Sequence, residues 1–444
     1  MRPNFNLMKA TLTGALGGLL FGFDTVVISG AIDALVKLYA LSANEKGFTV
    51  GIGLVGTVIG ALSAGVVGQK LGSRETLRIT AFLYIISAVG CGVAWGWTPF
   101  LLFRFIGGLG IGASSVLGPV YIAELSPAKW RGRLVAAFQL NVVFGIVVAY
   151  TSNYFIRLMH LGATEWRWQV GVAAVPAIGF LALLFGIPRS PRWSASRERI
   201  DEALAVLKMM GEANPEAELK DIRAALAEEH ASASEPVFRW KYRYPLFLAI
   251  SIGAFNQLAG INAILYYLND IFQAAGYSQL SGDEQAIAVG ATNLIFTMIG
   301  MSVIDKIGRK ILLLTGAAGT AACLAGVAYI YSSNSHQGSL LWILIVYIAF
   351  FALSQGAVIW VYIGEVFPNH VRSKGQGIGA ASHWFMATVI AMAFPKVVDS
   401  MSTATPFVFF AIMTVVQFFV VLFVYPETKG QTLEALQRKL VPAD

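Results

Sequence analysis

Long apolar runs dominate this sequence and restrict its fold more than any other feature. The stretch WILIVYIAFFALSQGAVIWVYI, residues 342–363, holds no charged residue and exceeds the ~20 residues that cross a bilayer as a helix. About twelve such runs occur, centred near residues 20, 57, 86, 110, 144, 178, 258, 294, 321, 351, 387 and 415. They are continuous and Gly-rich, whereas the strands of a membrane barrel alternate over ~10 residues. The runs predict an all-α membrane protein with twelve transmembrane helices.

The charges are few and unevenly distributed. Only 13% of residues are charged, against about 25% in soluble proteins, and the net charge is +7. Cations gather after alternate runs: Lys70, Arg74, Arg78, Lys129, Arg131, Arg133, Lys306, Arg309, Lys310, Arg372 and Lys374. The other connections carry mostly acids: Asp33, Glu45, Asp270, Asp283, Glu284 and Asp399. This positive-inside pattern predicts a multi-pass plasma membrane protein (cell inner membrane if bacterial) with both termini cytoplasmic, and it explains the charge better than nucleic-acid binding does.

The sequence contains no motif typical of an enzyme active site or a metal site. Cys91 and Cys323 lie in apolar runs without metal-ligand spacing and are interpreted as small buried hydrophobes. No nucleotide-binding loop, metal cluster or catalytic triad spacing appears. We therefore expect no enzymatic activity, no cofactor and no metal. The first run lacks a small-residue cleavage site and is too long for a signal peptide, so we expect it to be a retained helix.

Three motifs recur in the same order in the two halves. GQKLGSRE and IDKIGRKI place Gly72 and Gly308 236 positions apart. ELSPAKWR and EVFPNHVR are offset by 241, and IPRSPRW and YPETKG by 238. The sequence therefore predicts a duplicated six-helix unit. We expect an N-terminal bundle at 1–190, a cytoplasmic linker with short helices at 191–243, a C-terminal bundle at 244–426 and a cytoplasmic tail at 427–444.

These motifs resemble those of the sugar porter family of the major facilitator superfamily. The match extends over the whole chain, and its most specific part runs from Ile106 through Glu124 to Arg131. NQLAGINAILYY, WVYIGEVFPNHVR and PETKG add to it. The resemblance implies the major facilitator fold of two six-helix bundles. It also implies transport of monosaccharides or cyclic polyols by alternating access, by facilitators or by proton symporters.

The chain departs from the family pattern at several positions. Gln69 and Ser73 replace an acid and a base after the second run, and Arg189 replaces the acid after the sixth. Ala357 replaces the proline before the tryptophan of the tenth run. The changes at Gln69, Ser73 and Arg189 predict a weaker cytoplasmic charge network in the N-terminal half and an inward-facing resting bias.

Carboxamides within the apolar runs suit a polyol, because each offers donors and an acceptor. On the residues alone, Gln257 and Asn262 bind a ligand or merely link helices. Gly260 between them favours a break in the helix, as transporter binding helices often have. The resemblance implies sugar contacts by Gln139, Gln257, Asn262, Asn293 and Trp360. The expected substrate-binding set also includes Asn256, His383 and Trp384, and Tyr266 and Tyr267 are the expected extracellular gate. Proton sensing by His383, packing by the tryptophans and an interfacial role for the tyrosines stay open.

Asp24 is a carboxylate at the centre of the first run, where a charge costs ~2.5–3.5 kcal/mol on insertion scales. Its expected partner is Arg104 in the fourth run. Separation of the pair in a change of state would release or take up a proton, and the alternative is a static bridge. A further acid found in some proton symporters is replaced by Ala173.

At the cytoplasmic helix ends, the resemblance implies a charged gate made of Glu124, Arg131, Asp305, Arg309, Glu365, Arg372 and Glu427. Together these features predict a secondary active transporter that imports a monosaccharide or cyclic polyol in symport with protons. It would be a monomer in the lipid bilayer with no nucleic-acid partner. A facilitative uniporter and a non-transporting sugar sensor are the alternatives.

Overall fold

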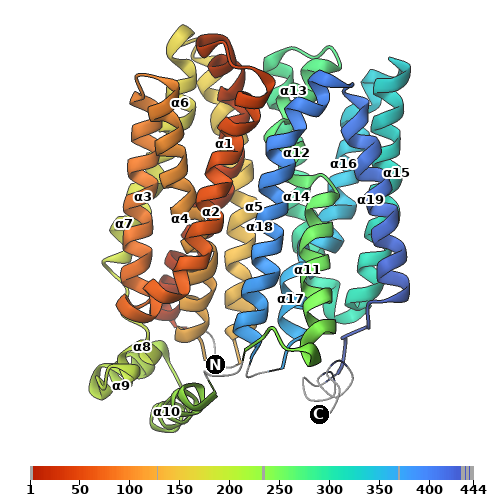
Figure 1. Cartoon of the computed structure of the whole chain (residues 1–444). Coiled ribbons are helices and arrows are strands. Elements are labelled where there is room, and N and C mark those ends of the chain that lie inside the picture. Colours follow the sequence, from red (N-terminus) through yellow and green to blue (C-terminus); the bar gives the residue numbers. More distant parts are fainter. Residues whose placement is uncertain are drawn as a thin grey trace. The chain divides into compact units, whose positions relative to one another are not determined.

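The computed structural model describes residues 4–127, 129–232, 236–368 and 371–431, together with Leu436 and Leu440. Within these residues the chain is helical and has no strand (Figure 1). Among the described residues, twelve helical stretches are long and apolar enough to cross a membrane, and each expected centre falls within one of them. The predicted twelve-helix fold is confirmed. Much of the tail expected at 427–444 lies outside the described residues.

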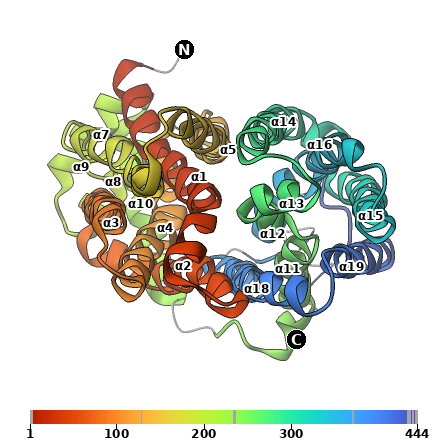
Figure 2. The same cartoon turned by 90° about the horizontal axis from the view of Figure 1, so that it is seen from above.

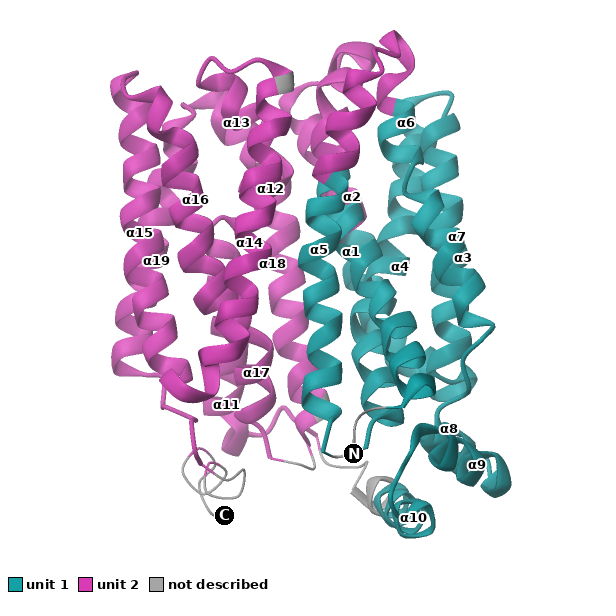
Figure 3. Ribbon diagram, turned by 180° about the vertical axis from the view of Figure 1, so that it is seen from behind, with its two compact units in different colours: residues 1–27, 55–149, 167–234 teal, residues 28–54, 150–166, 235–444 magenta. Residues whose placement is uncertain are grey.

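Packing divides the chain into two units, which are described separately (Figure 3). Unit 1 comprises residues 1–27, 55–149 and 167–234, and unit 2 comprises 28–54, 150–166 and 235–444. The first five helices are α1 (Phe5–Tyr39), α2 (Ala43–Leu71), α3 (Ser73–Val93), α4 (Trp97–Leu125) and α5 (Arg131–Leu158). The later segments of α1 and α5 and the first segment of α2 thus belong to unit 2.

The rest of unit 1 contains the later residues of α6 (Glu165–Gly171), α7 (Ala174–Leu184) and the linker helices α8 (Pro191–Ser196), α9 (Ile200–Met210) and α10 (Pro215–Ser232). In the core, α3 packs against α4 and α7, around Tyr121 and Phe180. The linker helices share a small apolar cluster of Ala195, Ala203, Leu207 and Leu219. Short helices in the linker were expected, and they are present.

Unit 2 also contains η1 (Gly162–Thr164) and the first residues of α6 (Glu165–Gly171). Its central helices are α11 (Arg243–Leu258), α12 (Ile261–Tyr266), α13 (Leu268–Ala274), α14 (Gln279–Ile307) and α15 (Arg309–Ser333). The last are α16 (Leu340–Phe351), the π-helical turn η4 (Ala352–Gly356), α17 (Ala357–Glu365), α18 (Arg372–Ser400) and α19 (Ala404–Phe423). Seen from above, α14, α16, α15 and α19 form an arc with α12 and α13 on its concave side (Figure 2).

The two halves repeat one local geometry as well as one set of motifs. Gly72 precedes α3 with φ 90° and ψ 151°, and Gly308 precedes α15 with φ 101° and ψ 158°. Tyr121 donates to the carbonyl of Pro188 at 2.8 Å, and its repeat mate Tyr362 donates to that of Pro426 at 3.1 Å. The packing of α3 on α4 and α7 has its counterpart in that of α15 on α16 and α19. The same turns and hydrogen bonds therefore occur at the offsets read from the sequence.

Candidate functional site

A buried ion pair lies inside unit 1. Arg104 of α4 places Nη1 3.0 Å from both carboxylate oxygens of Asp24 on α1. The two side chains are only 5% and 11% exposed. Gly107, one turn after Arg104, lets α4 lie close to α3 beside the pair, because a Cβ there would lie 2.4 Å from Ser87 Oγ. The partner expected for Asp24 is therefore the one it has.

In unit 2, the helix that carries the NQLAGINA motif is broken. α11 ends at Leu258 and α12 begins at Ile261, and Gly260 between them has φ +84°. This left-handed conformation favours glycine because it carries no Cβ. Tyr347 of α16 donates its hydroxyl to the carbonyl of Ala259 at 2.8 Å, which satisfies an acceptor at the break. The break expected at Gly260 is present, and it places Gln257 and Asn262 on separate helices.

An amide and an imidazole meet where α11 packs on α18. Gly253 permits the close approach, because a Cβ there would lie 2.7 Å from the carbonyl oxygen of Gly379. One turn later, Gln257 Nε2 lies 3.2 Å from His383 Nε2 and 3.1 Å from Asn256 Oδ1. Gln257 Oε1 is buried and has no hydrogen-bond partner among the described residues. An unused acceptor at this depth favours a ligand, since buried polar groups are almost always bonded.

Two tryptophans flank the imidazole. The ring of Trp360 on α17 lies 5.1 Å from that of His383, and the ring of Trp384 lies 4.9 Å from it at 89°. His383 and Trp384 are buried, whereas Trp360 is 38% exposed and keeps part of its apolar surface uncovered. Amides beside an open aromatic face are chemically suited to a sugar, whose hydroxyls form hydrogen bonds while its C–H groups contact the ring.

Three other residues expected to bind the sugar lie outside this group of side chains. Asn293 on α14 is buried and accepts a hydrogen bond from Thr297 at 3.3 Å. Asn262 on α12 is partly buried. In unit 1, Gln139 on α5 is also partly buried. The structure therefore brings together Asn256, Gln257, Trp360, His383 and Trp384, while the binding roles of the other three stay predictions.

The two tyrosines expected at the extracellular gate are held within unit 2. Tyr266 and Tyr267 are 3% and 1% exposed. Tyr267 donates to the carbonyl of Ala391 on α18 at 2.9 Å, and its ring stacks on Phe394 at 5.2 Å. In this state Tyr267 links the end of α12 to α18.

A buried amide pair was missed in the sequence. Gln355, within the π-helical turn η4, donates from Nε2 to Gln417 Oε1 of α19 at 3.0 Å, and both side chains are 1% exposed. Gln355 Oε1 is buried without a partner among the described residues. Two features of the sequence could have indicated this pair. Gln355 and Gln417 are carboxamides within apolar runs, and Gln355 directly precedes Gly356 and Ala357, where the family usually has Gly-Pro. Such turns are frequent at functional sites.

The charged gate residues of unit 2 form one network around the Gly308 turn. Arg309 pairs with Glu365 at 2.8 Å and with Asp305 at 3.0 Å. Glu427 accepts the backbone N–H groups of Arg309 and Lys310, each at 3.0 Å. Although partial burial acts to raise it, the pKa of Glu427 is held below its ordinary value by backbone hydrogen bonds from Lys429, Arg309, Lys310 and Thr428. The carboxylate thus caps the N-terminus of α15.

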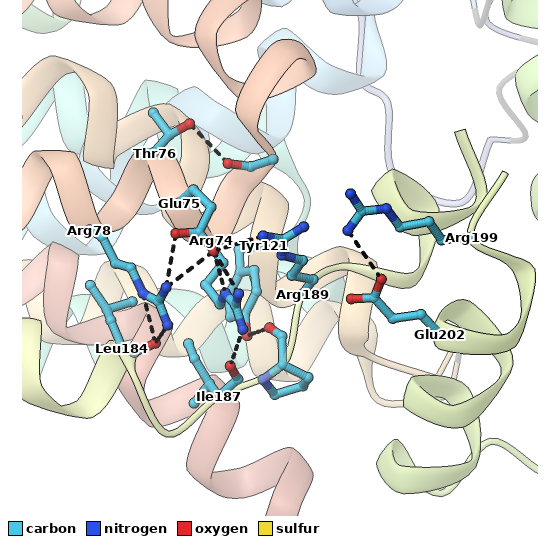
Figure 4. A network of polar contacts seen from close by, with 12 residues as sticks. Arg74, Glu75, Thr76, Arg78, Tyr121, Leu184, Ile187, Arg189, Arg199 and Glu202 are labelled. Atoms are coloured by element: carbon cyan, nitrogen blue, oxygen red, sulfur yellow. Dashed lines mark hydrogen bonds and ion pairs between the residues drawn. The ribbon is translucent and has the colours of Figure 1, made fainter. Parts of the chain in front are cut away.

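The matching network of unit 1 uses different residues (Figure 4). Ser73, the repeat mate of Arg309, donates its hydroxyl to Glu124 at 3.2 Å. Arg189, the mate of Glu427, pairs with Glu75 at 3.6 Å. Glu75 also pairs with Arg74 at 2.6 Å.

A third cation, Arg78, joins the group around Glu75, whereas Arg131 pairs elsewhere. Arg78 lies 2.9 Å from Glu75, on the next turn of α3. Arg131 forms an ion pair with Glu218 of the linker helix α10 at 3.7 Å. In unit 2, Arg372 donates to the carbonyl of Phe367. The expected loss of charge in the N-terminal network is therefore offset by Glu75, and the inward-facing bias stays a prediction.

The chain is similar to transporters over nearly its whole length. The family described as "Sugar (and other) transporter" matches residues 10–440. The arabinose-proton symporter of Bacillus subtilis is 35% identical, with 95% of this chain and 92% of the relative covered. The D-xylose-proton symporter of Escherichia coli is 33% identical, with 97% and 95% covered. A solved structure of the xylose transporter XylE from E. coli, in a partially occluded inward-open conformation, matches with a TM-score of 0.87 and 31% identity. That match covers 97% of this chain and 100% of the other.

Proposed function

The chain belongs to the sugar porter family of the major facilitator superfamily, and on that premise we propose that it imports a monosaccharide or cyclic polyol together with protons. It is a membrane transporter and not an enzyme. We infer that both termini are cytoplasmic, because cations gather in the connections on their side. The end of unit 2 that carries α13 is then the outer end.

The observation that carries the proton-coupling proposal is the Asp24–Arg104 pair. Removal of two charges from water costs several kcal/mol per ion, and a close pair offsets only part of this cost. Apolar side chains would fill the same space more cheaply, so a pair retained at this depth has a task beyond stability. A proton taken up by Asp24 would neutralise the acid and weaken its hold on Arg104. The two helices α1 and α4 would then respond to protonation.

The sugar-binding part of the proposal rests on unit 2. Gln257 Oε1 supplies a free acceptor, and His383, Asn256 and the open ring of Trp360 supply the surroundings of a polyol site. The relatives named above are symporters of arabinose and xylose by name, which supports a monosaccharide as the substrate.

Two alternatives compete with symport. A facilitator would keep the same sugar site with Asp24–Arg104 as a static bridge. A sensor would bind sugar without moving it. The named relatives favour symport, since two of them are proton symporters by name.

The test is uptake into proteoliposomes of labelled glucose, galactose, fucose, xylose, arabinose and myo-inositol, with and without an inward proton gradient. We expect gradient-driven accumulation of one sugar, and we expect Asp24→Asn to abolish it. The control Asp399→Asn, which removes an exposed acid at the end of α18, should leave accumulation unchanged. Equilibration unaffected by the gradient would make the protein a facilitator. Saturable binding without transport would make it a sensor.

A further inference from the structure

A second cluster of polar and charged side chains joins four helices at the outer end of unit 2. Lys46 of α2 donates from Nζ to Asp270 Oδ1 of α13 at 2.6 Å and lies 3.8 Å from Asp33 Oδ1 of α1. Asp33 Oδ2 accepts from Gln273 at 2.7 Å and from Gln279 at 3.3 Å. The cluster therefore fastens the later part of α1 and the start of α2 to α13 and α14.

The cluster has more carboxylates than cations. The carboxyl groups of Asp33 and Asp270 lie within hydrogen-bonding reach of each other and share the single ammonium of Lys46. The side chain of Asp270 is 25% exposed, yet its Oδ2 is buried and accepts no hydrogen bond from a described residue. Two carboxylates at this distance repel each other unless a proton lies between them.

The surrounding charges do not remove this imbalance. Arg157 of α5 contacts Asp283 of α14 and pairs with Glu165 at 3.1 Å. Glu284 accepts from the hydroxyl of Tyr154 at 3.3 Å. The ring of Tyr267 lies 5.9 Å from Lys46 Nζ and brings no charge.

We propose that the Asp33–Asp270 pair is a second proton-binding site, separate from Asp24. It holds one proton while the outer ends of α1 and α2 are closed on α13, and it releases the proton when they part. The assignment to the outer side rests on the orientation proposed above. The proton binds from the outer solution and returns to it, so this site adds no proton to the transport stoichiometry. Its effect is to make closure of the outer end depend on external pH.

The direction of the pH effect follows from the geometry. Burial raises the pKa of Asp270 from its ordinary value of 3.8 to about 7, with Asp33 adding to the rise and Lys46 opposing it. When the cluster opens, Asp270 faces water and its pKa returns toward 3.8. The closed state therefore binds the proton more tightly. The stabilisation of the closed state by proton binding is therefore complete below about pH 4 and is lost as the pH rises through about 7. Within that window the ratio of closed to open molecules changes by up to about tenfold per pH unit.

The experiment follows the distance between α2 and α13 in the full-length protein. Spin labels are placed on cysteines introduced at Asn44 and Ala274, which are both exposed, in a background with Cys91→Ala and Cys323→Ala that retains sugar uptake. Pulsed electron paramagnetic resonance in liposomes at equal internal and external pH then gives the population of the short distance from pH 5 to pH 8. We expect this population to fall as the pH rises.

Three variants of the cluster are then compared. Asp270→Asn, a neutral side chain of the same shape, should keep the short distance at every pH. Asp33→Asn should move the midpoint to lower pH because a neighbouring negative charge is lost, and Lys46→Gln should move it higher. The control Asp399→Asn should behave like the parent protein.

A parent protein without pH dependence would overturn the proposal, as would an unchanged profile in Asp270→Asn. Shifts of the same sign in Asp33→Asn and Lys46→Gln would also overturn it. The profile must persist in Asp24→Asn, and its loss there would assign the pH dependence to Asp24 instead. If proton-driven uptake fails while the distances still follow pH, the proposed function is wrong and the second site stands.

Discussion

Removal of one member of the Asp24–Arg104 pair should lower the free energy of unfolding more than removal of both members. In Asp24→Asn, the guanidinium of Arg104 stays buried and loses its carboxylate, and in Arg104→Met the carboxylate stays without its cation. An uncompensated buried charge costs about 3–5 kcal/mol, whereas replacement of a whole buried pair by neutral groups is often close to neutral. Because the side chains are 5% and 11% exposed, water compensates little of this loss.

A double-mutant cycle measures the difference. Asp24→Asn, Arg104→Met and the double variant are unfolded by detergent denaturant in mixed micelles, and the loss of helix is followed by circular dichroism. We expect each single variant to lose about 3 kcal/mol or more, and the double variant to lose less than either single variant. Counterflow of sugar should persist in Asp24→Asn, because exchange needs no net proton movement.

Additive losses would refute the reasoning. If the double variant loses the sum of the two single losses to within about 0.5 kcal/mol, the two side chains act independently, and no buried pair links α1 to α4. Proton coupling through this pair would then have no structural basis.

Two further predictions concern unit 2. Gln257→Ala should weaken sugar binding about tenfold in equilibrium binding assays, because about 1.4 kcal/mol of hydrogen bonding is lost. The control Gln376→Ala, at an exposed position, should leave the affinity unchanged. Equal affinities for the two variants would show that Gln257 does not bind the sugar. Gly260→Ala should lower stability by more than about 1 kcal/mol, since its φ is +84° and the new Cβ would lie 2.4 Å from the ring of Phe410. The control Gly179→Ala meets nothing within 4 Å and should be neutral or stabilising, so a gain in both variants would contradict the strained break.

The sequence was sufficient for features that depend on local pattern. The twelve spans follow from run length, and the repeated turns follow from Gly72 and Gly308, because a helix that starts from φ near +90° favours glycine there. The break at Gly260 was also predictable. Asp24 and Arg104 could be paired because a buried charge requires a partner, and few charges lie within apolar runs.

Pairings on the helix ends were beyond sequence reasoning. Asp33 and Lys46 flank the connection between the first two helices, Asp270 lies more than 220 residues later, and nothing in their spacing marks them as partners. The contact of Gln355 with Gln417 depends on how η4 packs against α19. Such contacts follow from tertiary packing, in which residues far apart in the chain choose among several available partners.

The two repeat networks show how the same turn tolerates an exchange of charge. In unit 2 a carboxylate, Glu427, caps α15, and the cation of Arg309 reaches Glu365. In unit 1 a hydroxyl replaces that cation, and Arg189 replaces the capping acid.

Arg189 has an acid available because Glu75 lies in the first turn of α3, where a negative charge is favoured by the helix dipole. A carboxylate near the N-terminus of α3 is thus kept, although it comes from α3 itself instead of from the segment after α7. Glu75 thus serves the three cations Arg74, Arg78 and Arg189, and it takes the place of the acid that the second half has at Glu427.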